Sequence, residues 1–147
     1  MNYTGNIYRP PFESNSLLLQ VTVGCSHNRC AFCTMYRDVP FQVEPLDQIS
    51  ADLDEAQRYW PNVTRVFLEN GDPFVLSADR LKAIAELIHQ ELPKVDTIAM
   101  YASIQNIKSK TDAELSELRS IGINGLNIGV ESGLDVALKR MREFLNL

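Results

Sequence analysis

The stretch LLLQVTVGCSHNRCAFC, residues 17–33, holds the first expected strand of this 147-residue chain and all three of its cysteines. The run from Leu17 to Val23 is short, apolar and increasingly β-branched, which predicts a buried strand. Cys25, Cys30 and Cys33 follow at once, with the spacing Cys-x4-Cys-x2-Cys. Thiolates gathered on one loop can bind a soft metal centre, so the sequence predicts a metal site after this strand.

Strand and helix patterns alternate along the rest of the chain. Apolar residues at helical spacing and N-terminal capping patterns mark the helices, and short apolar runs mark the strands. Strands are expected at 17–23, 63–68, 97–102 and 125–130, and helices are expected at 45–60, after the cap Ser77, after the capping box Thr111–Glu114 and after Ser132–Asp135. This alternation predicts an α/β fold with parallel strands and right-handed crossovers.

Four βα units make a partial (β/α) barrel or an open sheet, because an ordinary barrel of this type needs eight. Residues 17–147 are therefore expected to form a partial core domain, and residues 1–16 read as an N-terminal arm. In parallel α/β folds, ligand sites form at the carboxyl ends of the strands. The cysteine loop follows such an end.

Charge and composition narrow the function classes. The chain has 14 Lys and Arg against 19 Asp and Glu, a net charge of −5 that does not favour nucleic acid or an anionic membrane surface. No apolar run is long enough for a membrane span, and no segment reads as a secretory signal. Three cysteines without such a signal indicate a reducing compartment, so a cytoplasmic location is expected.

Three motifs together resemble the radical SAM superfamily. The loop from Cys25 to Cys33 is similar to its cluster loop, although the common form is Cys-x3-Cys-x2-Cys. The turn Glu69–Pro73 resembles its glycine-rich SAM-binding turn, with Asn70-Gly71-Asp72 where Gly-Gly-Glu is usual. Residues 128–133, IGVESG, resemble a segment of the branch with coproporphyrinogen oxidase-like and methylthiotransferase-like enzymes. The match runs from about residue 17 to residue 141.

The resemblance implies an enzyme that binds a [4Fe–4S] cluster and S-adenosylmethionine (SAM). Cys25, Cys30 and Cys33 would bind three irons, and SAM would chelate the fourth. Reductive cleavage of SAM would give a 5′-deoxyadenosyl radical, which abstracts a hydrogen atom from a substrate that the sequence does not identify. An external electron donor of the flavodoxin or ferredoxin type is implied. The implied SAM contacts are Phe32 at the adenine, Asn70, Gly71, Asp72 and Pro73 at the amino group, Glu131 at the ribose, and Ser103.

Each of these residues also has a simpler interpretation. His27 could join the cysteines in a zinc site of the Cys3His type, although it lies only two residues from Cys25. Phe32 could pack in the core. The sequence of residues 70–73, Asn-Gly-Asp-Pro, favours a turn whether or not it binds a ligand. Glu131 could stabilise the N-terminus of the following helix.

The superfamily core has six βα units, and only four are counted here. We therefore expect a chain truncated after the fourth unit, which leaves open a non-catalytic fragment that binds a cluster or a metal. The fourth strand, at 125–130, would then lack an outer neighbour. Free edges of parallel strands promote pairing, so self-association or pairing with another polypeptide is expected.

Overall fold

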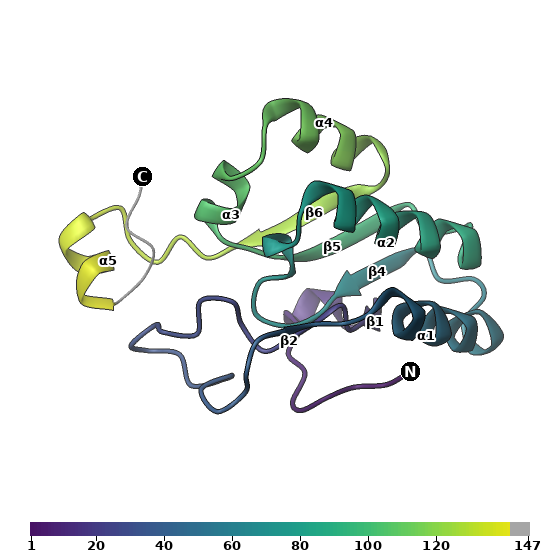
Figure 1. Ribbon diagram of the computed structural model, residues 1–147, viewed down its shortest axis with the longest axis horizontal. Helices are drawn as coiled ribbons and strands as arrows, with labels where there is room; N and C mark the ends of the chain where they lie inside the picture. Colours follow the sequence, from purple (N-terminus) through teal and green to yellow (C-terminus); the bar gives the residue numbers. More distant parts are fainter. Residues whose placement is uncertain (142–147) are drawn as a thin grey trace.

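The computed structural model describes residues 1–141 (Figure 1). The resemblance ends at about residue 141, and residues 142–147 lie outside the described part of the chain. The elements in chain order are η1 (Pro11–Glu13), β1 (Leu17–Leu19), β2 (Thr22–Val23), β3 (Gln42–Val43), α1 (Leu46–Tyr59), β4 (Arg65–Leu68), η2 (Pro73–Val75), α2 (Ala78–Glu91), β5 (Thr97–Ala102), α3 (Ile104–Lys108), α4 (Asp112–Ser120), β6 (Ile123–Ile128) and α5 (Asp135–Met141).

The main sheet has four parallel strands in the order β1-β4-β5-β6. This confirms the predicted α/β fold with a parallel sheet, and the arrangement is that of a partial βα core. Strand β5 occupies residues 97–102, as its apolar pattern predicts. Helix α4 begins with the predicted capping box, in which Thr111 Oγ1 accepts from the Glu114 N–H and the Glu114 carboxylate accepts from the Thr111 N–H.

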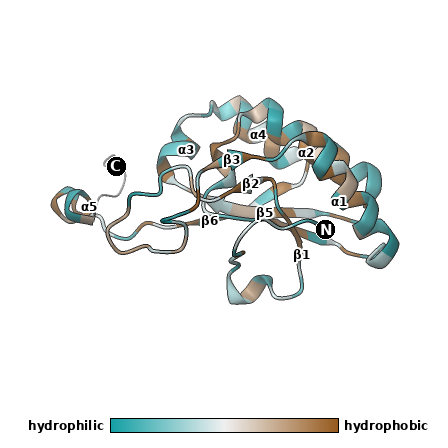
Figure 2. Cartoon of the chain, turned by 60° about the horizontal axis from the view of Figure 1, so that its bottom comes forward, coloured by the Kyte–Doolittle hydropathy of each residue, from teal (hydrophilic) through white to brown (hydrophobic). Residues whose placement is uncertain are grey.

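Helices α1, α2 and α4 cover one face of the sheet (Figures 1 and 2). Their apolar stripes pack on the alternate strand residues that point toward them, as the period-two geometry of strands requires. Full burial of each such side chain stabilises the fold by about 1.5–3 kcal/mol. The most enclosed members of this core include Leu19, Leu53, Val66, Ile84 and Met100.

The N-terminal arm lies against the opposite face of the sheet. Glu13 is fully buried there, and its carboxylate accepts hydrogen bonds from Arg65 Nε at 2.7 Å and Nη2 at 2.6 Å. Ser16 Oγ donates to the same carboxylate. Nearer the N-terminus, the Tyr3 hydroxyl donates to the carbonyl of Leu18 on β1 at 3.0 Å. The part of the arm around Glu13 is thus fixed on the face that the helices leave open, whereas the Asn2 N–H donates to Asp52 on α1 at 2.7 Å.

Several elements differ from the sequence prediction. The strand expected at 63–68 is β4, which starts at Arg65, and the short strand β3 was not predicted. The first strand is divided: β1 joins the main sheet, whereas β2 pairs antiparallel with β3. Between them lies the buried Gln20. Its side-chain amide accepts from the Thr4 N–H and donates to the Thr4 carbonyl in the arm. Strand β6 starts two residues earlier than expected, because Gly122, at φ +89°, turns the chain at once into the sheet. The five-residue helix α3 was not predicted.

The start of the last helix also differs in detail. Ser132 Oγ accepts from the Leu134 N–H at 3.1 Å, so the hydroxyl closes a local turn, and α5 begins at Asp135. Helix α5 lies beyond the carboxyl ends of the strands, away from the sheet (Figure 1). Within residues 1–141, no helix is both long and apolar enough to cross a membrane.

Candidate functional site

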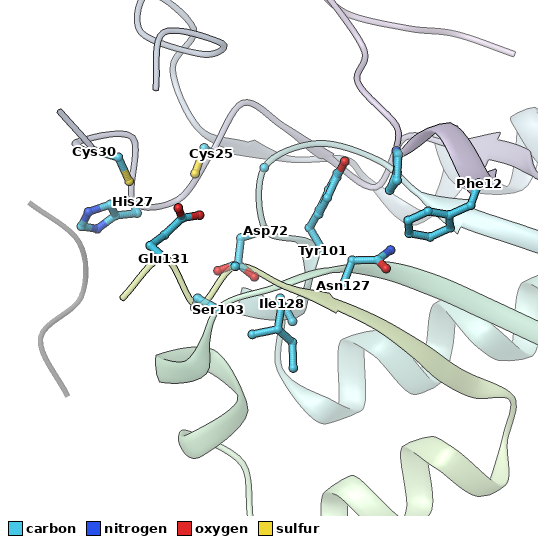
Figure 3. A pocket seen from close by; sticks show the side chains of 14 residues that line it. Phe12, Cys25, His27, Cys30, Asp72, Tyr101, Ser103, Asn127, Ile128 and Glu131 are labelled. Carbon is cyan, nitrogen blue, oxygen red and sulfur yellow. The ribbon is translucent and has the colours of Figure 1, made fainter. Parts of the chain in front are cut away.

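A cavity of about 490 Å³ opens at the carboxyl ends of the strands (Figure 3). Six of the residues implied by the sequence line it: Cys25, Cys30, Gly71, Asp72, Ser103 and Glu131. They come from the loops after β2, β4, β5 and β6. Segments far apart in the sequence therefore meet here because parallel strands end at one edge of the sheet.

The cysteine loop between β2 and β3 contains no helix or strand. Asn28, one of the four residues between the first two cysteines, adopts a left-handed backbone at φ +44°. Its side-chain amide donates to the carbonyl of Tyr36 at 2.6 Å. Asparagine tolerates this conformation better than most residues, so Asn28 closes the loop on itself. The Ala31 N–H also donates to the carbonyl of Met141 at the end of α5, at 2.8 Å.

Two glycines join the cysteine loop to the turn after β4. Gly24 has φ +73°, and its carbonyl accepts from the Gly71 N–H at 3.0 Å. A Cβ on Gly71 would stand 2.4 Å from Cys25 Cβ and 2.8 Å from Cys25 Sγ. Such distances are below van der Waals contact, so only glycine fits beneath Cys25. The absence of a side chain at Gly71 thus lets the cysteine loop pack closely on this turn.

Within residues 1–141 the three cysteines form no disulfide, and each is half-buried. Burial raises the pKa of the Cys25 thiol, and the negative charge of nearby Asp72 and Cys33 adds to the rise. Among residues 1–141, no three His, Cys, Asp or Glu side chains are grouped closely enough to hold a metal ion. The donor set itself fits an iron–sulfur cluster with one open iron, because it offers three soft thiolate ligands on one loop.

Asp72 is buried beside the cavity. Its Oδ2 accepts from Asn106 Nδ2 on α3 at 2.5 Å, whereas Oδ1 has no hydrogen-bond partner among the described residues. Burial raises the pKa of this carboxyl, and Ser103, Asn106 and Lys110 partly offset the rise. The Asp72 carboxylate thus lies in the cavity wall, with its Oδ1 enclosed by the fold.

Ser103 and Glu131 contribute the two remaining predicted contacts. Ser103 caps α3, where its hydroxyl accepts from the Asn106 N–H at 3.2 Å. Glu131 has a left-handed backbone at φ +52°, which is uncommon for a residue other than glycine or asparagine. Its side chain folds back over Gly129, where Oε1 lies 3.1 Å from the place that a Cβ would take. Both side chains face the cavity (Figure 3).

Four implied residues do not line the cavity. Asn70 is buried, and its amide donates to the Thr22 carbonyl at 2.5 Å, so it positions the turn on β2. Pro73 is buried as the first residue of η2. Cys33 is half-buried on the loop, and Phe32 is half-exposed.

The sequence did not single out several residues of the site. Phe12, Tyr101 and Asn127 line the cavity, and Asn106 binds Asp72. His27, considered above only as a zinc ligand, also lines it. The period-two alternation of β5 and β6 could have placed Tyr101 and Asn127 on the inner face, but the register that makes them neighbours has no local signal. The position of Phe12 in the cavity depends on the path of the N-terminal arm, and no sequence motif predicts that path.

Glu69 is a further buried group near the site. The side chain is fully enclosed, and neither carboxylate oxygen has a hydrogen-bond partner among the described residues. Burial raises its pKa to about 7, and the positive charge of Arg9 only partly opposes this. A buried carboxyl without partners is rare in folded proteins, because the charged form loses its solvation.

Comparison with known proteins agrees with this geometry. A family model described as the radical SAM superfamily matches residues 19–144. The chain belongs to the radical SAM superfamily. This radical SAM chain is also similar to the heme chaperone HemW of Bacillus subtilis (strain 168), with 24% identity over 123 residues. The similarity covers 80% of this chain and 32% of HemW, so the chain spans about a third of the length of that relative.

Proposed function

We propose that the chain binds a [4Fe–4S] cluster through Cys25, Cys30 and Cys33, and binds SAM in the adjacent cavity. Bound together, the two cofactors supply reductive cleavage of SAM to a 5′-deoxyadenosyl radical for hydrogen abstraction. The observation that carries the proposal is the cavity itself. It brings two of the three thiols together with Asp72, Ser103 and Glu131, within a chain of the radical SAM superfamily.

The protein's own groups have distinct roles in this proposal. The thiolates hold the cluster, and Gly71 sets the height of Cys25 above the turn after β4. Asp72, in the wall of the cavity, offers its carboxylate to the SAM ammonium group, since a carboxylate accepts strongly from a cationic donor. Ser103 and Glu131 offer hydroxyl and carboxylate oxygens to the ribose. Phe32, half-exposed on the loop, is proposed to pack against the adenine on binding.

The electron enters from outside in this proposal. The cysteine loop lies at the surface, with Arg29, Phe32 and Met35 exposed, so a small donor protein of the flavodoxin or ferredoxin type can approach the thiols. A cluster held by cysteine thiolates is suited to a reducing compartment such as the cytoplasm.

A second candidate is a non-catalytic metal site. His27 lines the same cavity as Cys25 and Cys30, so a zinc site with three thiolates and one imidazole would form if these side chains moved together on binding the metal. Such a site would bind metal without any dependence on SAM. The two candidates differ in the role of His27, and a variant at this position separates them.

The test is anaerobic reconstitution with iron and sulfide, followed by reduction in the presence of SAM. We expect about four irons and four sulfides per chain and formation of 5′-deoxyadenosine. Cys25→Ala should abolish both, whereas His27→Ala should retain the cluster. Tight zinc binding without iron–sulfur absorbance, lost in His27→Ala, would contradict the proposal and support the zinc site.

A further inference from the structure

The cavity extends beyond the residues assigned to the cofactors. In Figure 3, Cys30, His27 and Glu131 lie toward one end, and Phe12 and Asn127 lie toward the other. Tyr101 lies between Asp72 and this second end, which we call the far end. The proposed cofactor contacts leave its side chains unused.

Two strands place hydrogen-bonding groups side by side at the far end. Tyr101 on β5 is paired in register with Asn127 on β6, so both side chains point to the same face of the sheet. The Tyr101 ring packs edge-on against the fully buried Phe67, with ring centroids 5.3 Å apart and planes at 88°. This contact holds the tyrosine in place before any ligand binds.

Both side chains have donor groups that the described residues leave unsatisfied. Asn127 Nδ2 is buried and has no hydrogen-bond partner among them. An unpaired buried amide costs about 1–3 kcal/mol, and a bound ligand that accepts from it removes this cost. The Tyr101 hydroxyl is not engaged by any of the hydrogen bonds described for residues 1–141. Burial, with the charges of Glu13 and Glu69, raises the pKa of Tyr101, so its hydroxyl keeps its proton.

The N-terminal arm supplies an apolar wall opposite these donors. Pro10 is buried and Phe12 is 70% exposed, and both line the cavity. The buried ion pair between Glu13 and Arg65 fixes this part of the arm on the sheet. An exposed phenyl ring beside a cavity offers a flat surface on which a planar group can stack.

The charges around the far end select against an anion. Glu13 and Glu69 are both close enough to act on Tyr101, and Asp72 lies further along the same cavity. Arg65 is already committed to Glu13 by two hydrogen bonds. Glu13 and Arg65 form a pair without net charge, so the carboxyl that a ligand carboxylate would meet is Glu69, which is charged once the pH exceeds about 7. A neutral carbonyl can accept from both donors without this repulsion.

We propose that the far end is the substrate subsite of this chain, and that it takes a small, uncharged, planar molecule whose carbonyl accepts from Asn127 Nδ2 and the Tyr101 hydroxyl. The assignment of the ligand as substrate rests on the proposed SAM chemistry.

Benzamide, benzoate and toluene are suitable probes because they share a ring and differ in the group it carries. Ligand-observed NMR titrations use the full chain, both without metal and after anaerobic reconstitution with SAM present. At pH 8 we expect benzamide to bind at least about tenfold more tightly than benzoate, because the benzoate carboxylate would meet the charged Glu69. Toluene should bind more weakly than benzamide, since it leaves both donors unpaired.

Variants locate the binding. Asn127→Leu and Tyr101→Phe should each weaken benzamide binding about fivefold to tenfold, the loss of one hydrogen bond. Asn124→Leu, an exposed position on the same strand, is the matched control and should bind benzamide as the parent chain does. Equal binding of benzoate, or unchanged benzamide affinity in both variants, would overturn the subsite. Benzamide binding that follows this pattern in a chain that does not bind SAM would overturn the proposed function and leave the subsite standing.

Discussion

Gly71 is the residue on which the geometry of the thiols depends most directly. Even the single methyl of Gly71→Ala would stand 2.4 Å from Cys25 Cβ and 2.9 Å from Cys25 Cα, so the cysteine backbone must move. We expect a destabilisation of about 1–3 kcal/mol, as for other overpacked sites, and a loss of most cluster assembly. Thermal unfolding of the metal-free chain and iron content after reconstitution measure the two effects.

The matched control for this variant is Gly133→Ala. No atom lies within 4 Å of the place that its Cβ would take, and its backbone does not need a left-handed conformation. This variant should unfold like the parent chain and assemble the same amount of cluster. Normal cluster assembly in Gly71→Ala would show that Cys25 does not need its present position.

Glu69 predicts a pH dependence of stability. The pKa of its carboxyl is raised by burial from about 4.5 to about 7 in the folded chain. The neutral carboxyl therefore stabilises the fold fully below pH 4.5, and this contribution is lost as the pH rises through 7. Glu69→Gln, which cannot ionise, should be more stable than the parent by about 2 kcal/mol at pH 8 and show no such gain at pH 4.5.

Thermal unfolding across this pH range is the measurement. Glu86→Gln, at an exposed position on α2, serves as the control and should show no pH-dependent difference from the parent. Tyr3, Tyr36 and Tyr101 feel the charge of Glu69, but burial raises their own pKa values, so they stay neutral in this range. A gain that is the same at pH 4.5 and pH 8 would mean that Glu69 is not the titrating group.

At the scale of single elements, the sequence predicts the regular parts of this fold well. Strand β5 and the capped starts of α2 and α4 are found where expected, because local apolar spacing and side-chain caps decide them. The break between β1 and β2 depends on the distant Thr4, whose backbone bonds to Gln20. Helix α3 has five residues, too few for an apolar period, and its cap Ser103 is predicted from the sequence only as a SAM contact.

The candidate site also has one part that the sequence predicts and one part that it does not. The three motif loops were predicted to meet because parallel strands share one carboxyl edge. The pairing of Tyr101 with Asn127 depends on a register that shifts between Ile98 and Ala99, and no local pattern encodes that shift. The place of Phe12 depends on an ion pair between residues 52 positions apart.

The ion pair between Glu13 and Arg65 is expected to hold the N-terminal arm on the sheet. Arg65→Met leaves the Glu13 carboxylate buried without its partner, which should destabilise the chain by about 1–3 kcal/mol, since the Arg65 side chain is partly exposed. The arm should then be cleaved faster than the rest of the chain in limited proteolysis. Lys82→Met, which removes pairs with the exposed Asp79 and Glu117, should change stability by less than about 1 kcal/mol and leave the cleavage pattern as it is.

In the molecule as a whole, one face of the sheet forms the apolar core and the other forms the cavity. Helices α1, α2 and α4 bury one face and supply most of the apolar core. The other face carries the arm, the cavity and the unpaired polar groups Glu69 and Asn127. The stabilising layer is thus separated from the layer proposed to bind ligands, so substitutions in the cavity need not unfold the chain.

The edges of the sheet lead to the last prediction. In the described sheet, β1 has Tyr3 of the arm bonded at its side, whereas β6 is the outermost strand at the other edge. Apolar side chains near β6 are exposed, including Ile128 at 43% and Val130 at 54%. Because an exposed strand with free N–H and C=O groups pairs readily, we expect the chain to self-associate through β6.

Sedimentation of the anaerobically reconstituted chain over a range of concentrations tests this expectation. The parent chain should shift to larger species as the concentration rises, and Val130→Lys should weaken the shift, because a charge at the edge opposes strand pairing. Tyr59→Lys, at a position 69% exposed at the end of α1, controls for a general effect of added charge and should associate like the parent. If Tyr59→Lys abolishes association and Val130→Lys does not, the contact lies beside α1, and the edge at β6 is protected in another way.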